Sequence, residues 1–147
     1  MDANTEVLNF IFQNSEMGVN TLDELIEIAG DVPFEQVLLK QREGYKSINQ
    51  EAVRLIEESK QEPKGLSKLE QIKTYLMVKA STLTHQSASH FAEMMIQGSI
   101  MGIIDLCKQL NSYKEIKPEI RALAEHLLQF EEGNVEELKK YLRQDKA

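Results

Sequence analysis

The stretch SASHFAEMMIQGSIMGIIDLCKQL, residues 87–110, decides how the rest of the chain can fold. No charged residue stands between Glu93 and Asp105. Apolar side chains fall on every side of a helical wheel there, a pattern typical of a helix that is buried nearly all round. Small residues inside this helix would let a second backbone come close, and we assign three of them to a helix crossing: Gly98, Ser99 and Gly102.

Length and composition indicate one globular domain, residues 1–147. A chain of this size buries roughly 70% of its unfolded surface, which is enough for a core without disulfides or metals. The apolar fraction of 41% and the charged fraction of 28% are ordinary for such a domain. The net charge of -7 argues against nucleic acid as a partner, because nucleic-acid binders carry basic patches.

Cysteine usage and hydropathy indicate a cytoplasmic location. Cys107 is the only cysteine, so no disulfide framework exists and a reducing compartment is expected. The segment MDANTEVLNF, residues 1–10, lacks the basic region of a signal peptide. The longest uncharged apolar run, residues 94–104, is far short of the roughly 20 residues that a membrane span needs. We therefore expect no membrane span.

Helical periodicity recurs along the chain and no convincing strand alternation occurs, so the sequence predicts an all-α fold. Gly30 is a natural helix stop, and Pro118 suits the first turn of a helix. The segment between residues 84 and 89, rich in Ser and Thr, is either a turn or a kink. Four long helices and one shorter crossover helix are expected, the long ones at about 5–29, 33–60, 89–113 and 118–143 and the crossover at about 67–84.

An internal repeat relates the two halves of the chain. FIFQNSEMGVNTL (residues 10–22) resembles MMIQGSIMGIIDL (residues 94–106), with Gln, Ser, Met, Gly and Leu recurring in place. A similar shift superimposes the apolar stripes of the second and last helices and sets Tyr45 on Glu131. We predict two antiparallel hairpins around a pseudo-twofold axis, with Gly18 and Gly102 at the crossing of the first and fourth helices.

Two hairpins joined by a long crossover resemble the ferritin-like four-helix bundles, and the chain is similar to small bacterial ferritin-like proteins of unassigned activity. The resemblance covers nearly the whole chain at the level of topology. It implies a ferritin-like bundle. The di-iron site of that family uses Glu-x-x-His motifs on two helices, and this sequence contains none. The family's iron chemistry is therefore not implied for these residues.

A buried polar cluster is predicted at mid-bundle. Glu131 falls in the middle of an apolar stripe, where a carboxylate costs several kcal/mol unless it is paired or protonated. Tyr45 and Ser99 are the partners that could satisfy it. The cluster is either a polar layer that fixes helix register or a contact for a ligand or metal, and its predicted members are Ser15, Gln41, Tyr45, Ser99, Glu131 and Asn134.

Metal-ligating patterns are weak elsewhere. His90 and Glu93 stand three residues apart on one helical face, and His85 could approach them across the break. A solvated helix start explains the same residues more simply. The three methionines of this helix, Met94, Met95 and Met101, are predicted to lie in the core.

Two functions fit the sequence. The favoured one is a non-catalytic bundle that acts through protein contacts, as a homodimer and without a cofactor, and the sequence names no other partner. Its motivation is surplus apolar surface on the first helix, at Phe10, Phe12, Met17 and Val19, and on the fourth. The alternative is a degenerate ferritin-like bundle that binds a divalent metal or a small molecule at the polar cluster.

Overall fold

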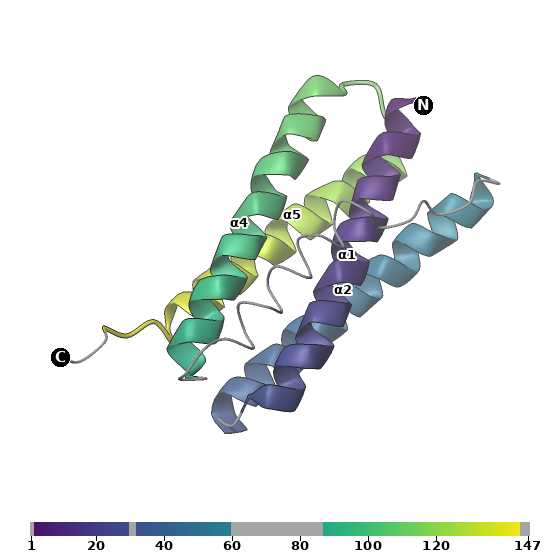
Figure 1. The fold of residues 1–147 in the computed structure, drawn as a ribbon. Helices are drawn as coiled ribbons and strands as arrows, with labels where there is room; N and C mark the ends of the chain where they lie inside the picture. Colours follow the sequence, from purple (N-terminus) through teal and green to yellow (C-terminus); the bar gives the residue numbers. More distant parts are fainter. Residues whose placement is uncertain (1, 30–31, 60–86, 145–147) are drawn as a thin grey trace.

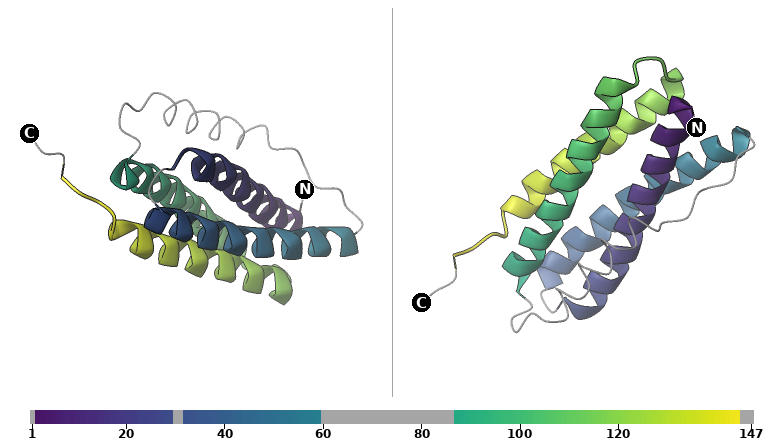
Figure 2. Two further views of the ribbon diagram at one scale, coloured as in Figure 1. Left: turned by 90° about the horizontal axis from the view of Figure 1, so that it is seen from below. Right: turned by 45° about the horizontal axis from the view of Figure 1, so that its top comes forward.

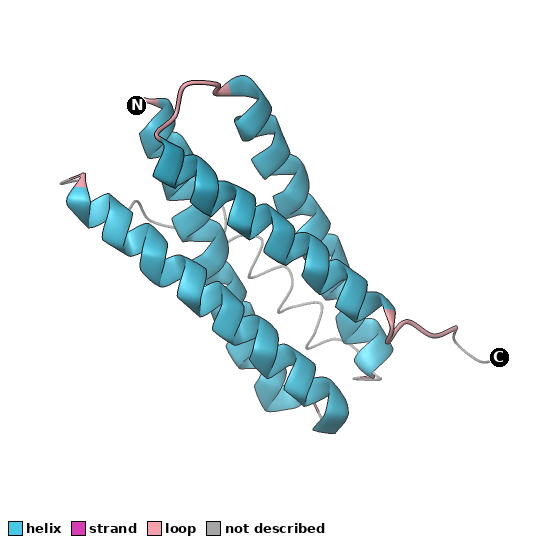
Figure 3. Cartoon of the chain, turned by 180° about the vertical axis from the view of Figure 1, so that it is seen from behind, coloured by secondary structure: helices cyan, strands magenta, loops and turns pink. Residues whose placement is uncertain are grey.

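The computed structural model describes residues 2–29, 32–59 and 87–144, and these residues form helices and no strand (Figures 1 and 3). The predicted all-α class is confirmed for this part of the chain. The expected helix bounds agree to within a few residues, except that the last helix ends at Lys139 rather than near residue 143. The predicted crossover helix lies outside the described residues. The helices are α1 (Ala3–Ile28), α2 (Val32–Glu58), α4 (Ala88–Ser112) and α5 (Pro118–Lys139).

The helices pack as two antiparallel pairs, α1 with α2 and α4 with α5 (Figures 1 and 2). Helix α4 begins at the end of the bundle where α1 finishes, so these two helices also run in opposite directions (Figure 1). The start of α1 and the connection between α4 and α5 therefore share one end of the molecule.

Each helix buries one stripe of apolar side chains at three- and four-residue spacing. In α1 the stripe includes Val7, Ile11 and Leu22, each at most 2% exposed. Burying a side chain of this kind stabilises the fold by roughly 1.5–3 kcal/mol relative to leaving it in water. The largest side chains that are almost wholly buried come from all four helices: Phe34, Phe91, Ile11, Leu22, Leu38, Ile48, Leu106, Leu127 and Leu138.

Side-chain contacts fasten both ends of the bundle. At one end the Tyr113 hydroxyl donates to the Glu6 carboxylate, and the backbone N–H of Lys117 donates to Asn4 Oδ1 at 2.8 Å. These bonds hold the α4–α5 connection against the first turn of α1. At the other end three rings meet, with Phe34 stacked on Phe91 at 6.4 Å and edge-on to Tyr141 at 5.0 Å between centroids.

The expectation that the fourth helix is buried nearly all round is wrong. Ile100, Met101 and Ile104 are 42%, 49% and 48% exposed, although Met94 lies in the core as predicted. The half-buried Met95 packs against that core. Helical spacing shows which residues could be buried, but neighbouring helices cover α4 on its inner side only. None of the helices in the described ranges combines the length and apolar character needed to cross a membrane.

The surplus apolar surface predicted on the first helix is not exposed either. Phe10, Phe12 and Val19 are partly buried and pack against the core, and Met17 is half-buried. The two helices therefore differ in how many large apolar residues they expose. Helix α1 exposes only Ile28, at its end, whereas α4 exposes three residues that lie close together.

Candidate functional site

A buried hydrogen bond joins the two hairpins at mid-bundle. The Tyr45 hydroxyl on α2 donates to Glu131 Oε2 on α5 at 2.8 Å. Tyr45 is 7% exposed and Glu131 is 2% exposed. Ser99 on α4 adds a second hydrogen bond to the carboxylate. The partners that the sequence predicted for Glu131 are thereby confirmed, and three helices meet at one carboxyl group.

Burial dominates the acid–base properties of this pair. It raises the pKa of Glu131 to about 7, against which the hydrogen bonds from Tyr45 and Ser99 act in the lowering direction. Burial and the adjacent Glu131 carboxylate raise the pKa of Tyr45 well above its ordinary value of 10. The phenol therefore stays protonated and remains a hydrogen-bond donor at neutral pH.

The structure buries all of the predicted cluster, but it brings only part of it together. Asn134 lies close enough to Tyr45 to affect its pKa, so it belongs to the Tyr45–Ser99–Glu131 centre. Ser15 does not, because its Oγ donates to the Ile11 carbonyl oxygen at 2.7 Å. The six buried members are Ser15, Gln41, Tyr45, Ser99, Glu131 and Asn134.

Three asparagines that the sequence reasoning missed add to the polar interior, and one of them, Asn9 on α1, is 8% exposed. Asn49 Nδ2 on α2 donates to Ser15 Oγ at 3.1 Å and to the Phe12 carbonyl oxygen at 3.2 Å. Asn14 on α1 is 5% exposed, and its amide lies against Gly102. Asn14 lies in the α1 stripe, three residues after Ile11 and four before Gly18, so helical spacing did mark it, whereas Asn49 follows Ile48 at the edge of the α2 stripe.

Two amide groups of the interior are not satisfied. Gln41 Nε2 and Asn134 Nδ2 are buried, and neither makes a hydrogen bond of normal geometry with a described residue. A buried donor without a partner costs roughly 1–3 kcal/mol. Asn134 thus gives the Tyr45–Ser99–Glu131 centre one spare donor, which a buried water or a small acceptor could use.

The close approaches at glycine differ from the predicted crossing. A Cβ on Gly18 would lie 2.6 Å from the Tyr45 ring, so Gly18 serves the contact between α1 and α2. A Cβ on Gly102 would lie 2.8 Å from Asn14 Nδ2, so Gly102 faces α1 from α4. Gly98 is half-buried. The two glycines of the repeat therefore do not meet each other, because the side chains of Tyr45 and Asn14 stand against them.

The structure does not assemble the predicted metal ligands. His90 is half-buried and Glu93 is exposed in the first turns of α4, and His85 falls outside the described residues. Within residues 2–29, 32–59 and 87–144, no three side chains of His, Cys, Asp or Glu come together in a way that could hold a metal ion. Glu131 is the single carboxylate of the Tyr45–Ser99–Glu131 centre.

The outward side of α4 is the most apolar exposed helix face in the described structure. Three of its exposed residues, Ile100, Met101 and Ile104, form one patch within little more than a turn. The other exposed large apolar residues, Ile28, Leu39 and Leu142, come from three different segments. We use the name α4 outer face for the exposed residues of this side: Glu93, Gln97, Ile100, Met101, Ile104, Asp105, Lys108 and Asn111.

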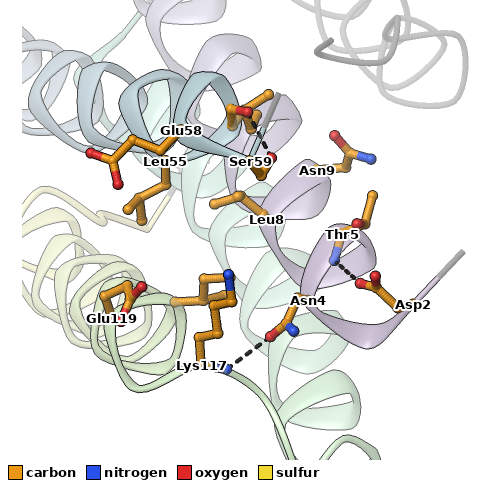
Figure 4. A pocket seen from close by; sticks show the side chains of 12 residues that line it. Asp2, Asn4, Thr5, Leu8, Asn9, Leu55, Glu58, Ser59, Lys117 and Glu119 are labelled. Carbon is orange, nitrogen blue, oxygen red and sulfur yellow. Dashed lines mark hydrogen bonds between the residues drawn. The ribbon is translucent and has the colours of Figure 1, made fainter. Parts of the chain in front are cut away.

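A pocket of about 350 Å³ opens where the starts of α1 and α5 meet the end of α2 (Figure 4). Its lining combines apolar side chains such as Leu8 and Leu55 with polar groups. Several of the polar groups already have structural partners. Asp2 accepts a hydrogen bond from Thr5 N as the cap of α1, and Asn4 binds the Lys117 backbone (Figure 4).

No protein-family model matches the chain, and no curated protein or solved structure matches it either.

Proposed function

We propose that this protein is a non-catalytic helical bundle that acts through protein contacts and forms a homodimer through the α4 outer face. The exposed patch of Ile100, Met101 and Ile104 carries the proposal. A cytoplasmic location goes with it, supported by the single Cys107. Nucleic acid is not a proposed partner, since the net charge is -7.

The α4 outer face has the composition of a small interface. Its apolar centre is bordered by Glu93, Asp105 and Lys108, an arrangement of apolar core and polar rim that protein interfaces share. Covering the three apolar side chains would remove each of them from water. A twofold dimer uses the same patch on both copies, so one such face is sufficient.

Sedimentation equilibrium across micromolar concentrations tests the homodimer. We expect the wild-type chain to sediment as a dimer and the Ile104→Asp variant as a monomer, because the substitution puts a charge at the centre of the contact. Leu39→Asp is the matched control: Leu39 is 37% exposed on α2, and this variant should remain dimeric. A wild-type chain that is strictly monomeric would remove the proposal.

A degenerate ferritin-like bundle that binds a divalent metal or a small molecule is the second candidate. The observation in its favour is the pair of unsatisfied amides, Gln41 Nε2 and Asn134 Nδ2, in the interior that holds Glu131. The ferritin-like topology and the internal repeat remain proposals as well, supported by the two antiparallel pairs.

Metal analysis of protein purified without chelator tests this second candidate. Bound iron, manganese or zinc at near one equivalent, lost in Glu131→Gln, would support it. Metal-free protein whose melting temperature does not respond to any of the three ions would contradict metal binding at this centre.

A further inference from the structure

We propose that two copies of the chain pair with their α4 helices antiparallel, around a twofold axis at the level of Gly102. The inference rests on the self-association proposed above and specifies its geometry. It follows from the order of charged and apolar residues along the α4 outer face.

The charges of this face are separated along the helix. Glu93 stands near the start of α4, Ile100 and Ile104 occupy the middle, and Lys108 lies toward the end. Three- and four-residue steps keep these side chains in one line. At 1.5 Å per residue, Glu93 and Lys108 are about 22 Å apart along the axis. Along the line through Glu93, Ile104 and Lys108 the face is therefore acidic near the start of α4 and basic toward its end, with the Asp105 carboxylate to one side of that line.

An antiparallel pair brings unlike ends together. With the axis at Gly102, Ile100 of one copy lies opposite Ile104 of the other, so the apolar patches cover each other. Lys108 then lies within about 5 Å, along the helix axis, of the level of the other copy's Glu93. A lysine side chain spans that offset. Asp105 stands on the flank of the face, near the level of the other copy's Gln97.

A parallel pair would bring like ends together. Glu93 of one protomer would face Glu93 of the other, and Lys108 would face Lys108. Like charges across an interface are destabilising. The same apolar patch would be covered in either orientation. The charged residues therefore decide the orientation, and they favour the antiparallel one.

Charge reversal tests this pairing by sedimentation equilibrium at low salt. Glu93→Lys alone and Lys108→Glu alone should each weaken the dimer on the order of tenfold, since each change turns two symmetry-related attractions into repulsions. The double variant Glu93→Lys/Lys108→Glu should return to within about twofold of the wild type. Single variants that dimerise as well as the wild type would overturn the antiparallel pairing while leaving self-association in place.

Cross-linking gives a second measurement that does not depend on charge. In a Cys107→Ser background, Met101→Cys lies close to the axis and should form a disulfide-linked dimer under mild oxidation. Gln97→Cys should not, because its two copies would be about 15 Å apart along the helices. Disulfides from both variants would show a parallel pair and overturn the inference. A monomeric wild-type chain would overturn both the inference and the proposed homodimer.

Discussion

At Glu131, burial and hydrogen bonding act on the pKa in opposite directions, and burial is the stronger. The folded pKa of about 7 exceeds the ordinary value of 4.5, so the folded protein binds this proton more tightly than the unfolded chain does. The stabilisation from the bound proton is complete below about pH 4.5 and is lost as the pH rises through 7.

We predict that Glu131→Gln removes this pH dependence. A glutamine can still accept the Tyr45 hydrogen bond, and it stays neutral. Relative to the wild type, the variant should gain on the order of 3 kcal/mol between pH 4.5 and pH 8, from a pKa shift of 4.5 to about 7. Urea unfolding at a series of pH values measures the difference. Glu132→Gln, at the exposed neighbouring position, is the control, and a flat difference for Glu131→Gln would contradict the prediction.

Replacing glycines by alanine distinguishes two effects on stability, the loss from overpacking at a tight contact and the gain from higher helix propensity. Gly18→Ala should lose roughly 1–3 kcal/mol from overpacking, because the added methyl would meet the Tyr45 ring at 2.6 Å. The ring is buried, stacks edge-on with Phe130 at 4.8 Å and is hydrogen-bonded to Glu131, so it cannot move away freely. Gly133 has open space around its Cβ position, and Gly133→Ala should gain up to about 1 kcal/mol of helix propensity.

Gly44 offers a further check on the same argument. The repeat predicts that Gly44 tolerates alanine, since it has no counterpart in the other hairpin. The structure contradicts this, because a Cβ there would run into the Phe130 ring. Urea unfolding should therefore show that Gly44→Ala, like Gly18→Ala, lowers the free energy of unfolding. Stabilisation by both substitutions would show that neither contact is tight.

Residue spacing predicted which polar residues are buried better than it predicted the hydrogen bonds that they make. The stripe positions placed Tyr45 and Glu131 inside the bundle at matching places of the two halves, and Tyr45 was one of the two partners, with Ser99, that could satisfy the carboxylate. Spacing could not show that Ser15 bonds to Asn49 instead. Which polar side chain turns inward at the edge of a stripe depends on the rotation of each helix against its neighbours, which follows from packing.

At the scale of elements, the helix starts differ in how they are capped. The side chain of Asp2 caps α1 by accepting from Thr5 N at 2.8 Å, and Ser87 caps α4 by accepting from His90 N at 3.2 Å. The cap position of α5 holds Lys117, whose side chain makes no capping hydrogen bond. Pro118 has no N–H and the Ile120 N–H donates to the Lys117 carbonyl oxygen at 3.0 Å, so the first-turn N–H groups of α5, those of Glu119 and Ile120, lack only the side-chain acceptor that α1 and α4 have.

We predict that Lys117→Ser stabilises the protein by about 1 kcal/mol, because serine can accept from these N–H groups. The backbone bond from residue 117 to Asn4 is kept in the variant, so the end of the bundle stays fastened. Asp2→Ala should cost a similar amount by removing an existing cap. Thermal unfolding of both variants measures the changes, and a Lys117→Ser variant no more stable than the wild type would contradict the argument.

Helix positions were predictable from the sequence to a few residues, because periodicity, Gly30 and Pro118 mark them directly. The exposure of α4 was not predictable in the same way. A helix that is apolar on all sides can be buried, but the number of neighbours it finds depends on how many helices the chain supplies and where they pack.

For the whole molecule, self-association and stability are linked. A second copy that binds only the folded chain stabilises it by mass action. We predict that the melting temperature rises by roughly 2–3 °C for each tenfold increase in protein concentration above the dissociation constant, because each tenfold increase adds about 0.7 kcal/mol per chain of the dimer. Ile104→Asp should melt at one temperature at every concentration. A concentration-independent wild type would contradict dimerisation of the folded state.

The bond between Tyr45 and Glu131 also has a consequence for the order of folding. These residues are 86 positions apart, whereas most contacts within each antiparallel pair join residues closer in sequence. Closing a longer loop costs more entropy, so we expect each pair to form first and the Tyr45–Glu131 contact to form after the rate-limiting step. Tyr45→Phe should then accelerate unfolding and leave the refolding rate unchanged in stopped-flow experiments.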